Sequence, residues 1–333
     1  MNLRKTLSAL CACLCLCVSL ATVMTAFTAC TPAASDTDPA DDGVIRIVCT
    51  TFPAFEFARM LTEGQGTDDV RFEVTMLSSR GQDLHNFQPS AADIRTLAAA
   101  DVFVCVGGTS EAWVDKAVAS AKNDALTTVT MMKVCEAMVE ELPEGAEAEE
   151  EHDDDATEVE YDEHIWTSFG NAAAIVDAVA DAVKGKLTDQ PALTAAVAGK
   201  QSALKDTLSD LRGRYTDMIA AAKRHAVVIA DRFPFAYLFR ELGLTVYAAF
   251  PGCSAETQAS FATQVFLVGK TKELSLPAVF TVDNGAGSVA STVSQETGAQ
   301  VLRLWSGQTI PDGGMTYLEM LEENLRNLTI ALN

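Results

Sequence analysis

Residues 191–222 (PALTAAVAGKQSALKDTLSDLRGRYTDMIAAA) form the longest uninterrupted helical pattern in the chain. Thr188 and Asp189 are the candidate N-caps, because Pro191 suits a first helical turn. At about 1.5 Å per residue, the helix would be about 50 Å long, which exceeds the width of an ordinary domain. A coiled-coil helix is one interpretation. Strand–helix units flank the pattern on both sides, so we favour a stiff spine along two lobes. Its apolar residues, spaced by three, four and seven, are Leu193, Val197, Leu204, Leu208, Leu211, Tyr215, Met218 and Ile219.

Strand and helix patterns alternate on both sides of this spine; one helix pattern, for example, covers residues 256–274. This alternation predicts parallel sheets with helices on both faces. We therefore expect an α/β protein of two lobes, each with a parallel sheet of about four strands flanked by helices, joined by one long rigid helix. In such sheets ligands bind beyond the carboxyl ends of the strands, which places the site in the cleft between the lobes. The strand patterns are residues 44–50, 71–77, 102–108, 127–132, 225–231, 244–250, 277–283 and 299–305.

The first 29 residues have the composition of a signal peptide. Arg4 and Lys5 precede an apolar run, which ends in small residues before Cys30. This pattern resembles a bacterial lipoprotein signal, with Cys30 as the lipid-bearing first residue of the mature chain. An uncleaved membrane anchor is the alternative, and both place the folded part outside the cytoplasmic membrane. Residues 30–43 then form the lipidated cysteine and a flexible tether.

The remaining chain divides into an N-terminal lobe (44–187), the spine (188–223) and a C-terminal lobe (224–333). Within the first lobe, residues 136–163 contain 15 acidic residues, one histidine and no lysine or arginine. We expect a mobile, solvated loop there, because so polar a segment cannot build a packed core. Such a loop could raise the local cation concentration, or it could only keep the protein soluble. Its candidate metal-scavenging residues are His152, Asp153, Asp154 and Asp155.

Charge and cysteine content exclude several classes of function. Without residues 1–29, which hold two basic and no acidic side chains, 22 basic and 46 acidic side chains remain, a net charge of −24. Nucleic acid is an unsuitable partner for such a surface. Four cysteines besides Cys30 remain, too few for a disulfide framework, and none forms a CxxC pair.

Two histidines and one aspartate are the candidate metal ligands. His85 lies in the polar loop GQDLHNFQPS after the second strand pattern, and His164 lies among apolar residues after the acidic segment. Asp231 ends the strand at 225–231, where it could bind a cation, pair with Arg232 or cap the next helix. Two imidazoles and a carboxylate suit Zn²⁺, and leave Mn²⁺ or iron open. The sequence has no GxSxG, HExxH, Walker or GxGxxG motif, but a metal-dependent hydrolase with the same ligands stays possible.

Several segments together resemble the zinc/manganese solute-binding lipoproteins of bacterial ABC importers, the ZnuA-like and TroA-like family. They agree in order and spacing from about residue 44 to the C-terminus. The resemblance implies that His85, His164 and Asp231 bind the metal and that residues 136–163 are the metal-scavenging loop of the family. The segments are the cysteine motif at Cys30, GQDLHNFQPSAADI, the acidic loop, YDEHIWTSFGNA, the spine, ADRFPFAYLFRELGL and SAETQAS.

One departure concerns the fourth ligand, commonly an aspartate just after the last strand in that family. Trp305 and Ser306 occupy this place here. Asp283, Glu256 or water could complete the metal shell, or the site could stay open.

The resemblance implies an extracytoplasmic, lipid-anchored, monomeric receptor and not an enzyme. It would capture Zn²⁺, or Mn²⁺, and deliver it to an ABC permease with its cytoplasmic ATPase. The continuous spine predicts small lobe motions on metal release. A zinc hydrolase and a surface adhesin are the alternatives.

Overall fold

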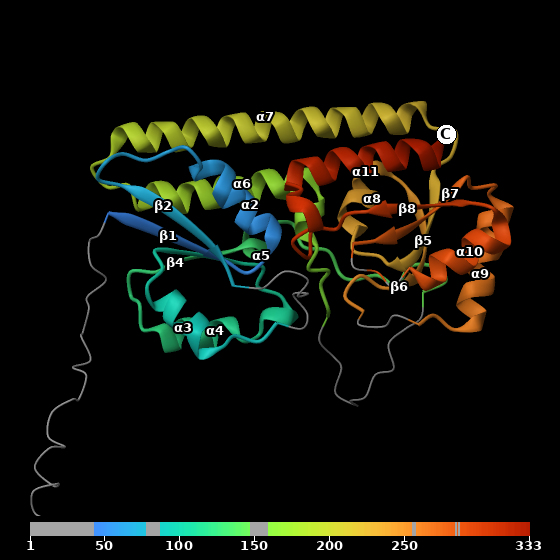
Figure 1. The fold of residues 1–333 in the computed structure, drawn as a ribbon, viewed down its shortest axis with the longest axis horizontal. Helices are drawn as coiled ribbons and strands as arrows, with labels where there is room; N and C mark the ends of the chain where they lie inside the picture. Colours follow the sequence, from blue (N-terminus) through green and yellow to red (C-terminus); the bar gives the residue numbers. More distant parts are fainter. Residues whose placement is uncertain (1–42, 78–86, 147–158, 255–257, 284, 286) are drawn as a thin grey trace, which may run out of the picture. The chain divides into compact units, whose positions relative to one another are not determined.

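The computed structural model describes residues 43–77, 87–146, 159–254, 258–283, 285 and 287–333. Figure 1 shows the arrangement of their helices and strands. In this described part, no helix is both long and apolar enough to cross a membrane. The elements are β1 (Val44–Cys49), α2 (Phe52–Thr62), β2 (Arg71–Met76), α3 (Ala91–Ala98), β3 (Val102–Cys105), α4 (Val114–Ala121), β4 (Thr127–Thr130), α5 (Met131–Val134), α6 (Phe169–Gly185), α7 (Pro191–Ala221), β5 (Ala226–Arg232), α8 (Ala236–Leu242), β6 (Thr245–Phe250), α9 (Phe261–Glu273), β7 (Ala278–Val282), α10 (Ser288–Thr297), β8 (Gln300–Leu304) and α11 (Tyr317–Leu332), with 3₁₀ turns at Thr109–Glu111, Ile165–Thr167 and Asp312–Gly314.

The strands form two four-stranded sheets with the same topology. Their orders are β2-β1-β3-β4 and β6-β5-β7-β8, and all pairs are parallel. The predicted two-lobe α/β fold is therefore confirmed. In each sheet the chain first passes from the first strand to one edge strand (β2 or β6) and then crosses back to the other side of the first strand (β3 or β7). The loops after β1 and β3, and those after β5 and β7, therefore lead in opposite directions. This divergence opens space for side chains at the carboxyl ends of the strands.

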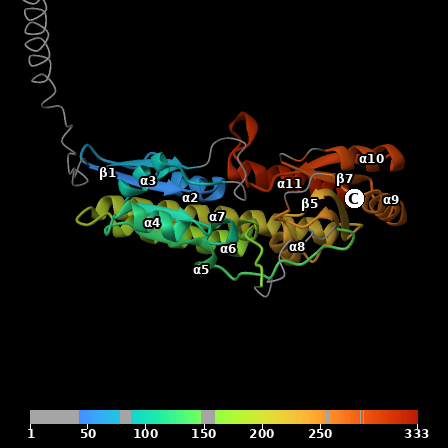
Figure 2. The ribbon, with the colours of Figure 1, turned by 90° about the horizontal axis from the view of Figure 1, so that it is seen from below.

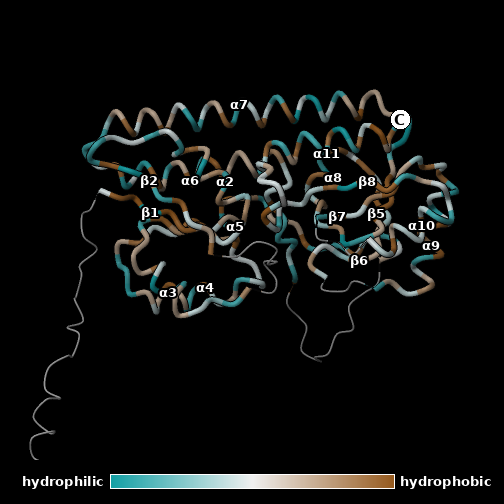
Figure 3. The backbone as a smooth tube through the Cα atoms, in the orientation of Figure 1, coloured by the Kyte–Doolittle hydropathy of each residue, from teal (hydrophilic) through white to brown (hydrophobic). Residues whose placement is uncertain are grey.

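The long helix α7 runs along both lobes as predicted. It packs against α2 and α6 of the first lobe and against α8 and α11 of the second (Figures 1 and 2). Hydrophobic and hydrophilic residues alternate along it in Figure 3. Tyr215 of the stripe also donates a hydrogen bond from its hydroxyl to the carbonyl of Leu321 in α11 (2.6 Å). All predicted stripe residues except the partly buried Ile219 are buried.

The predicted N-cap of this helix is wrong. The N-cap is Gln190, and its side chain makes no capping hydrogen bond. Pro191 sets this position, because it occupies the first helical turn and has no N–H to be capped. Asp189 lies one residue earlier in the left-handed region (φ 62°).

Helices cover both faces of each sheet. α3 and α4 cover one face of the first sheet, and α9 and α10 cover one face of the second. The opposite faces share one large apolar core with α2, α6, α7, α8 and α11. Because this core continues from one lobe into the other, the two lobes are packed together and not merely tethered.

The acidic segment is packed at both ends, so the prediction of a solvated loop throughout residues 136–163 is wrong. Val139 bridges Tyr161 in antiparallel fashion, and Glu144 bridges Tyr247 of β6 in the second lobe. Pro143 is buried there. Met138 packs partly buried against the core and Asp162 and Glu163 are buried, whereas Val139 and Tyr161 stay exposed. Residues 147–158, including His152, Asp153, Asp154 and Asp155, lie outside the described residues.

Two predicted element boundaries are also wrong. Met131 and Met132, assigned to a strand, begin the short helix α5. The helix expected from residue 256 begins only at Phe261, where the Ser260 hydroxyl accepts a hydrogen bond from the N–H of Thr263 (3.1 Å). A serine N-cap satisfies an N–H group that the first helical turn leaves without a partner.

Candidate metal site

His164 is fully buried and its imidazole has a fixed tautomer. Its Nδ1 lies 2.8 Å from Oδ1 of Asp162, and its backbone N–H donates to the same oxygen (2.7 Å). The 3₁₀ turn Ile165–Thr167 and the Ser168 cap of α6 follow directly and fix the backbone. A carboxylate oxygen accepts, so Nδ1 carries the proton and Nε2 presents its lone pair. An imidazole oriented in this way by a carboxylate is typical of a metal ligand.

The Nε2 of His164 faces the second lobe. The Nε2 of Gln308, in the loop after β8, lies 2.6 Å from it. Gly252, in the loop after β6, lies so close that a Cβ there would be 3.2 Å from the imidazole ring. A residue of the first lobe is thus enclosed by loops at the carboxyl ends of strands in the second.

Three hydrogen bonds hold the His164 segment against the second lobe. Trp166 donates from Nε1 to the carbonyl of Ser306 (2.7 Å), and its own carbonyl accepts from the hydroxyl of Tyr317 (2.6 Å). The carbonyl of Asp162 accepts from the hydroxyl of Tyr237 (2.7 Å). The imidazole position is therefore set from both lobes.

Asp231 lies at the end of β5 as predicted and is 8% exposed. Its Oδ2 accepts from the hydroxyl of Thr281 (2.7 Å) and the N–H of Val282 (3.3 Å), and its Oδ1 accepts from the N–H of Arg232 (2.9 Å). It does not cap α8, whose N-cap is Phe235. The carboxylate is thus a buried brace between β5 and β7. Its Oδ2 already accepts two hydrogen bonds, whereas its Oδ1 accepts only the one from Arg232 among the described residues and keeps a second lone pair.

Asp283, a predicted alternative for the fourth ligand, is tied to the loop after β8. Its Oδ1 accepts from the N–H of Ser306 (2.6 Å) and its Oδ2 from the Ser306 hydroxyl (3.1 Å). Burial raises the pKa of this carboxyl, and the bonds from Ser306 oppose the rise. The N–H of Gln308 in turn donates to the Ser306 hydroxyl (3.2 Å). A connected series of hydrogen bonds therefore runs from Asp283 to His164.

The structure tests only part of the predicted ligand set. His85 and the other alternative, Glu256, lie outside the described residues, as does Cys30. In the described ranges, no group of three or more His, Cys, Asp or Glu side chains is arranged to hold a metal ion. The structure places Gln308, which was not predicted and whose amide is not a usual metal ligand, next to His164. Its position three residues after Trp305, close to where the family places a ligand, was the available signal.

Two further carboxylates, Glu111 and Glu163, are buried at the end of β3 in the first lobe. Glu111 accepts from the N–H of Gly107 (2.8 Å) and Glu163 from the N–H of Ser110 (2.8 Å). Oε1 of Glu111 and Oε2 of Glu163 have no hydrogen-bond partner among the described residues. Burial raises the pKa of Glu111 to about 7, and the nearby charge of Glu163 adds to the rise.

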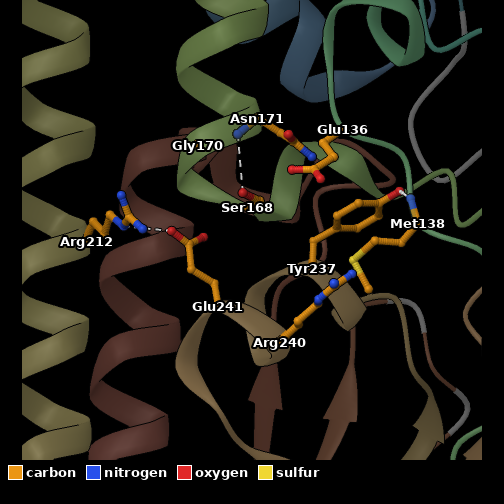
Figure 4. A pocket seen from close by; sticks show the side chains of 9 residues that line it. All are labelled: Glu136, Met138, Ser168, Gly170, Asn171, Arg212, Tyr237, Arg240 and Glu241. Atoms are coloured by element: carbon orange, nitrogen blue, oxygen red, sulfur yellow. Dashed lines mark hydrogen bonds and ion pairs between the residues drawn. The ribbon is translucent and has the colours of Figure 1, made fainter.

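A pocket of about 510 Å³ lies between the lobes beside α7 (Figure 4). Glu241 of α8 accepts from the N–H of Phe169 (3.1 Å) and pairs with Arg212 of α7 (2.7 Å). The pocket wall includes Tyr237, which contacts the segment that carries His164. These contacts join the first lobe, the spine and the second lobe at one place.

Comparison with known proteins agrees with this architecture. Residues 47–331 match the family model described as zinc-uptake complex component A, periplasmic (ZnuA). The zinc-binding lipoprotein AdcA of Streptococcus pneumoniae is 27% identical over 293 residues, covering 86% of this chain and 56% of AdcA. The high-affinity zinc uptake system protein ZnuA of Bacillus subtilis is 26% identical over 295 residues, covering 86% of this chain and 88% of that protein.

A solved structure gives the same result for the fold. The laminin-binding protein Lmb of Streptococcus agalactiae, described as bifunctional with adhesin and metal transporting activity, matches with a TM-score of 0.69 at 23% identity, covering 87% of this chain and all of that one. At this identity the likeness concerns the fold. The chain spans about half the length (56%) of the AdcA relatives that it matches.

Proposed function

Because this chain belongs to the family of periplasmic zinc-uptake components (ZnuA), we propose that it is an extracytoplasmic receptor that captures Zn²⁺, or alternatively Mn²⁺. It delivers the ion to an ABC permease driven by a cytoplasmic ATPase. Family membership confirms the prediction that the chain is not an enzyme, which removes the hydrolase alternative.

The observation that carries this proposal is the state of His164. Its imidazole is fully buried, its Nδ1 is bonded to Asp162, and its Nε2 faces the boundary of the two lobes. A carboxylate that fixes the tautomer and raises the basicity of an imidazole is the usual support of a metal-binding histidine. We assign His85, His164 and Asp231 as the ligands, two imidazoles and one carboxylate, which fit Zn²⁺.

The receptor is held at the membrane by a lipid on Cys30, followed by the tether of residues 30–43. This arrangement keeps the site close to the permease while the ion is exchanged. The receptor needs no second copy to bind the ion, because all three assigned ligands come from one chain, and we expect it to act as a monomer. The net charge of −24 after removal of residues 1–29 favours cations over anions near the surface.

Metal content and affinity of purified variants test the proposal. We expect the wild-type protein to bind one Zn²⁺ per chain by elemental analysis and titration calorimetry, and Mn²⁺ more weakly. His164→Ala, His85→Ala and Asp231→Ala should each weaken zinc binding by more than about 100-fold, because loss of an outer-shell partner alone typically costs 10- to 100-fold. Asp162→Asn alters only the partner of His164 and should weaken zinc binding by about 10- to 100-fold.

The exposed histidine His225 provides the matched control. It directly precedes β5, at the end of the strand away from the site, so His225→Ala should bind zinc as the wild type does. Equal zinc affinity in His164→Ala and His225→Ala would refute the proposed site.

The continuous helix α7 also restricts how the site opens. Bending a helix that packs on both lobes costs more than moving a loop. We therefore expect metal-free and zinc-bound crystal forms to differ in loops near the site and not by a wide opening of the lobes.

If the protein is instead an adhesin, its adhesion should not depend on the metal ligands. The laminin-binding relative shows that this fold occurs in a protein described as an adhesin. Adhesion to laminin that persists in His85→Ala, together with unchanged permease-dependent growth in low zinc, would favour it.

A further inference from the structure

Gln308 occupies the same imidazole lone pair that a metal ion requires. In the neutral imidazole, where the Nδ1 proton is donated to Asp162, the Nε2 atom accepts. The amide group at 2.6 Å must therefore donate its N–H to Nε2, which fixes the orientation of the Gln308 amide.

The distance leaves no place for an ion on this lone pair. Two ligands of a tetrahedral zinc ion, each at about 2.0 to 2.1 Å, lie about 3.3 Å apart. The two nitrogen atoms here are closer than that, and an amide N–H cannot coordinate a cation. The Gln308 side chain must turn or withdraw before His164 binds metal.

The surroundings keep Gln308 in this position. Gln308 is 4% exposed, and its backbone N–H donates to the hydroxyl of Ser306, which itself contacts Asp283. The adjacent Gly307 (φ 77°) lies against Pro53, Trp166 and Met320, so the loop is packed on both lobes. A buried, packed side chain exchanges hydrogen bonds less readily than an exposed one.

We propose that Gln308 is a neutral latch on the metal site: in the metal-free protein its amide N–H closes the Nε2 lone pair of His164, and metal entry breaks that hydrogen bond. This inference rests on the proposed function, because it assumes that His164 binds the ion. The latch keeps a buried imidazole satisfied between rounds of delivery, since an unpaired buried acceptor is unfavourable. It also lowers affinity for every cation alike, because each entering ion must first break this hydrogen bond.

The first test detects the hydrogen bond itself. An N–H···N bond transmits a scalar coupling between its two nitrogen nuclei, so NMR of metal-free, ¹⁵N-labelled protein should show coupling between Gln308 Nε2 and His164 Nε2. Gln308→Met keeps the length of the side chain and removes the donor, so its spectrum should lack the coupling. Absence of the coupling in the metal-free wild type would overturn the latch.

The second test measures its effect on binding. Stopped-flow mixing with Zn²⁺, followed by intrinsic tryptophan fluorescence, should show a zinc association rate about three- to tenfold higher in Gln308→Met, as expected for loss of one net hydrogen bond. The dissociation rate should stay unchanged, and thermal melting should verify that the variant folds. An unchanged or slower association, or a faster dissociation, would contradict the latch and identify Gln308 as a bystander or a direct ligand.

The two proposals fail in distinguishable ways. Wild-type protein that binds no zinc would refute the proposed function. Wild-type protein that binds zinc tightly, with equal rates in Gln308→Met, would refute the latch alone.

Discussion

The two sheets have the same strand order, but the carboxylates buried at their carboxyl ends differ in hydrogen bonding. In the second lobe, Asp231 accepts three hydrogen bonds and Asp283 accepts two from Ser306. In the first lobe, Glu111 and Glu163 each keep one oxygen without a partner among the described residues. The second lobe thus offers a preorganised carboxylate, whereas the first buries charge that is only partly compensated.

The largest effect is expected from removal of Asp231. Asp231→Ala would leave Thr281, Val282 and Arg232 each without one acceptor, and should lower the free energy of unfolding by about 3 kcal/mol. Urea denaturation with a metal chelator present measures this loss without the contribution of bound ion. Asp231→Asn keeps one acceptor oxygen and should lose about half as much. An alanine variant as stable as the wild type would show that the brace between β5 and β7 is unimportant.

Glu111 should give a pH-dependent effect of similar size. Its folded pKa of about 7 lies above the usual 4.5, so the native state binds more protons than the unfolded state between these values. Stability should therefore fall as pH rises from 5 to 8, by about 2.5 kcal/mol. Glu111→Gln removes this pH-dependent contribution. The free energy of unfolding of the variant should therefore rise relative to that of the wild type as the pH increases.

Urea denaturation at several pH values tests this expectation. The groups that face Glu111 are Glu163, the hydroxyl of Thr50 and the N–H groups of Gly107 and Val106, and only Glu163 carries charge. The exposed Glu73 on β2 is the matched control, and Glu73→Gln should leave the pH profile unchanged. Parallel profiles for the wild type and Glu111→Gln would contradict the contrast between the lobes.

A single donor to Asp231 should matter less. Thr281→Val removes the 2.7 Å hydrogen bond at nearly constant volume and should cost about 1 kcal/mol. Thr281→Ser keeps the hydroxyl and should recover most of that loss. The same denaturation assay checks both, and equal stability of the valine and serine variants would argue against a hydrogen-bonded Asp231.

The smallest effect is expected at the ion pair between Glu241 of α8 and Arg212 of α7. Glu241→Gln weakens the ion pair with the half-exposed Arg212, which should cost less than about 1 kcal/mol. It also weakens the acceptor for the N–H of Phe169, so hydrogen exchange at the start of α6 should accelerate. Arg214→Gln, which removes the ion pair with Glu322 at the other junction of α7, is the control and should leave α6 unchanged.

Local patterns in the sequence predicted most of the fold. The stripe on α7, the eight strands and the position of Asp231 at the end of β5 follow from apolar periodicity, which the structure retains. The start of α9 and the assignment of Met131 and Met132 to a strand were predicted wrongly. Both lie at element boundaries, where a single capping residue decides at which residue a helix begins. The packed ends of the acidic segment were missed because an average composition hides the few apolar residues that make contacts.

The surroundings of His164 could be predicted only in part. Its inward position follows from Ile165 and Trp166, and Asp162 lies two residues away in the chain. Its contact with Gln308 joins residues 144 positions apart, and depends on how the loop after β8 folds against the other lobe. No local pattern encodes such a contact, and an amide is chemically unremarkable in sequence.

The segment that carries His164 precedes the spine in the chain, yet Tyr237, Ser306 and Tyr317 beyond the spine hold it. A truncated protein ending near residue 187 would therefore contain His164 but lack the three residues that hold its segment in place. The surroundings of His164 are therefore complete only after the last helix, which supplies Tyr317, has folded against the first lobe.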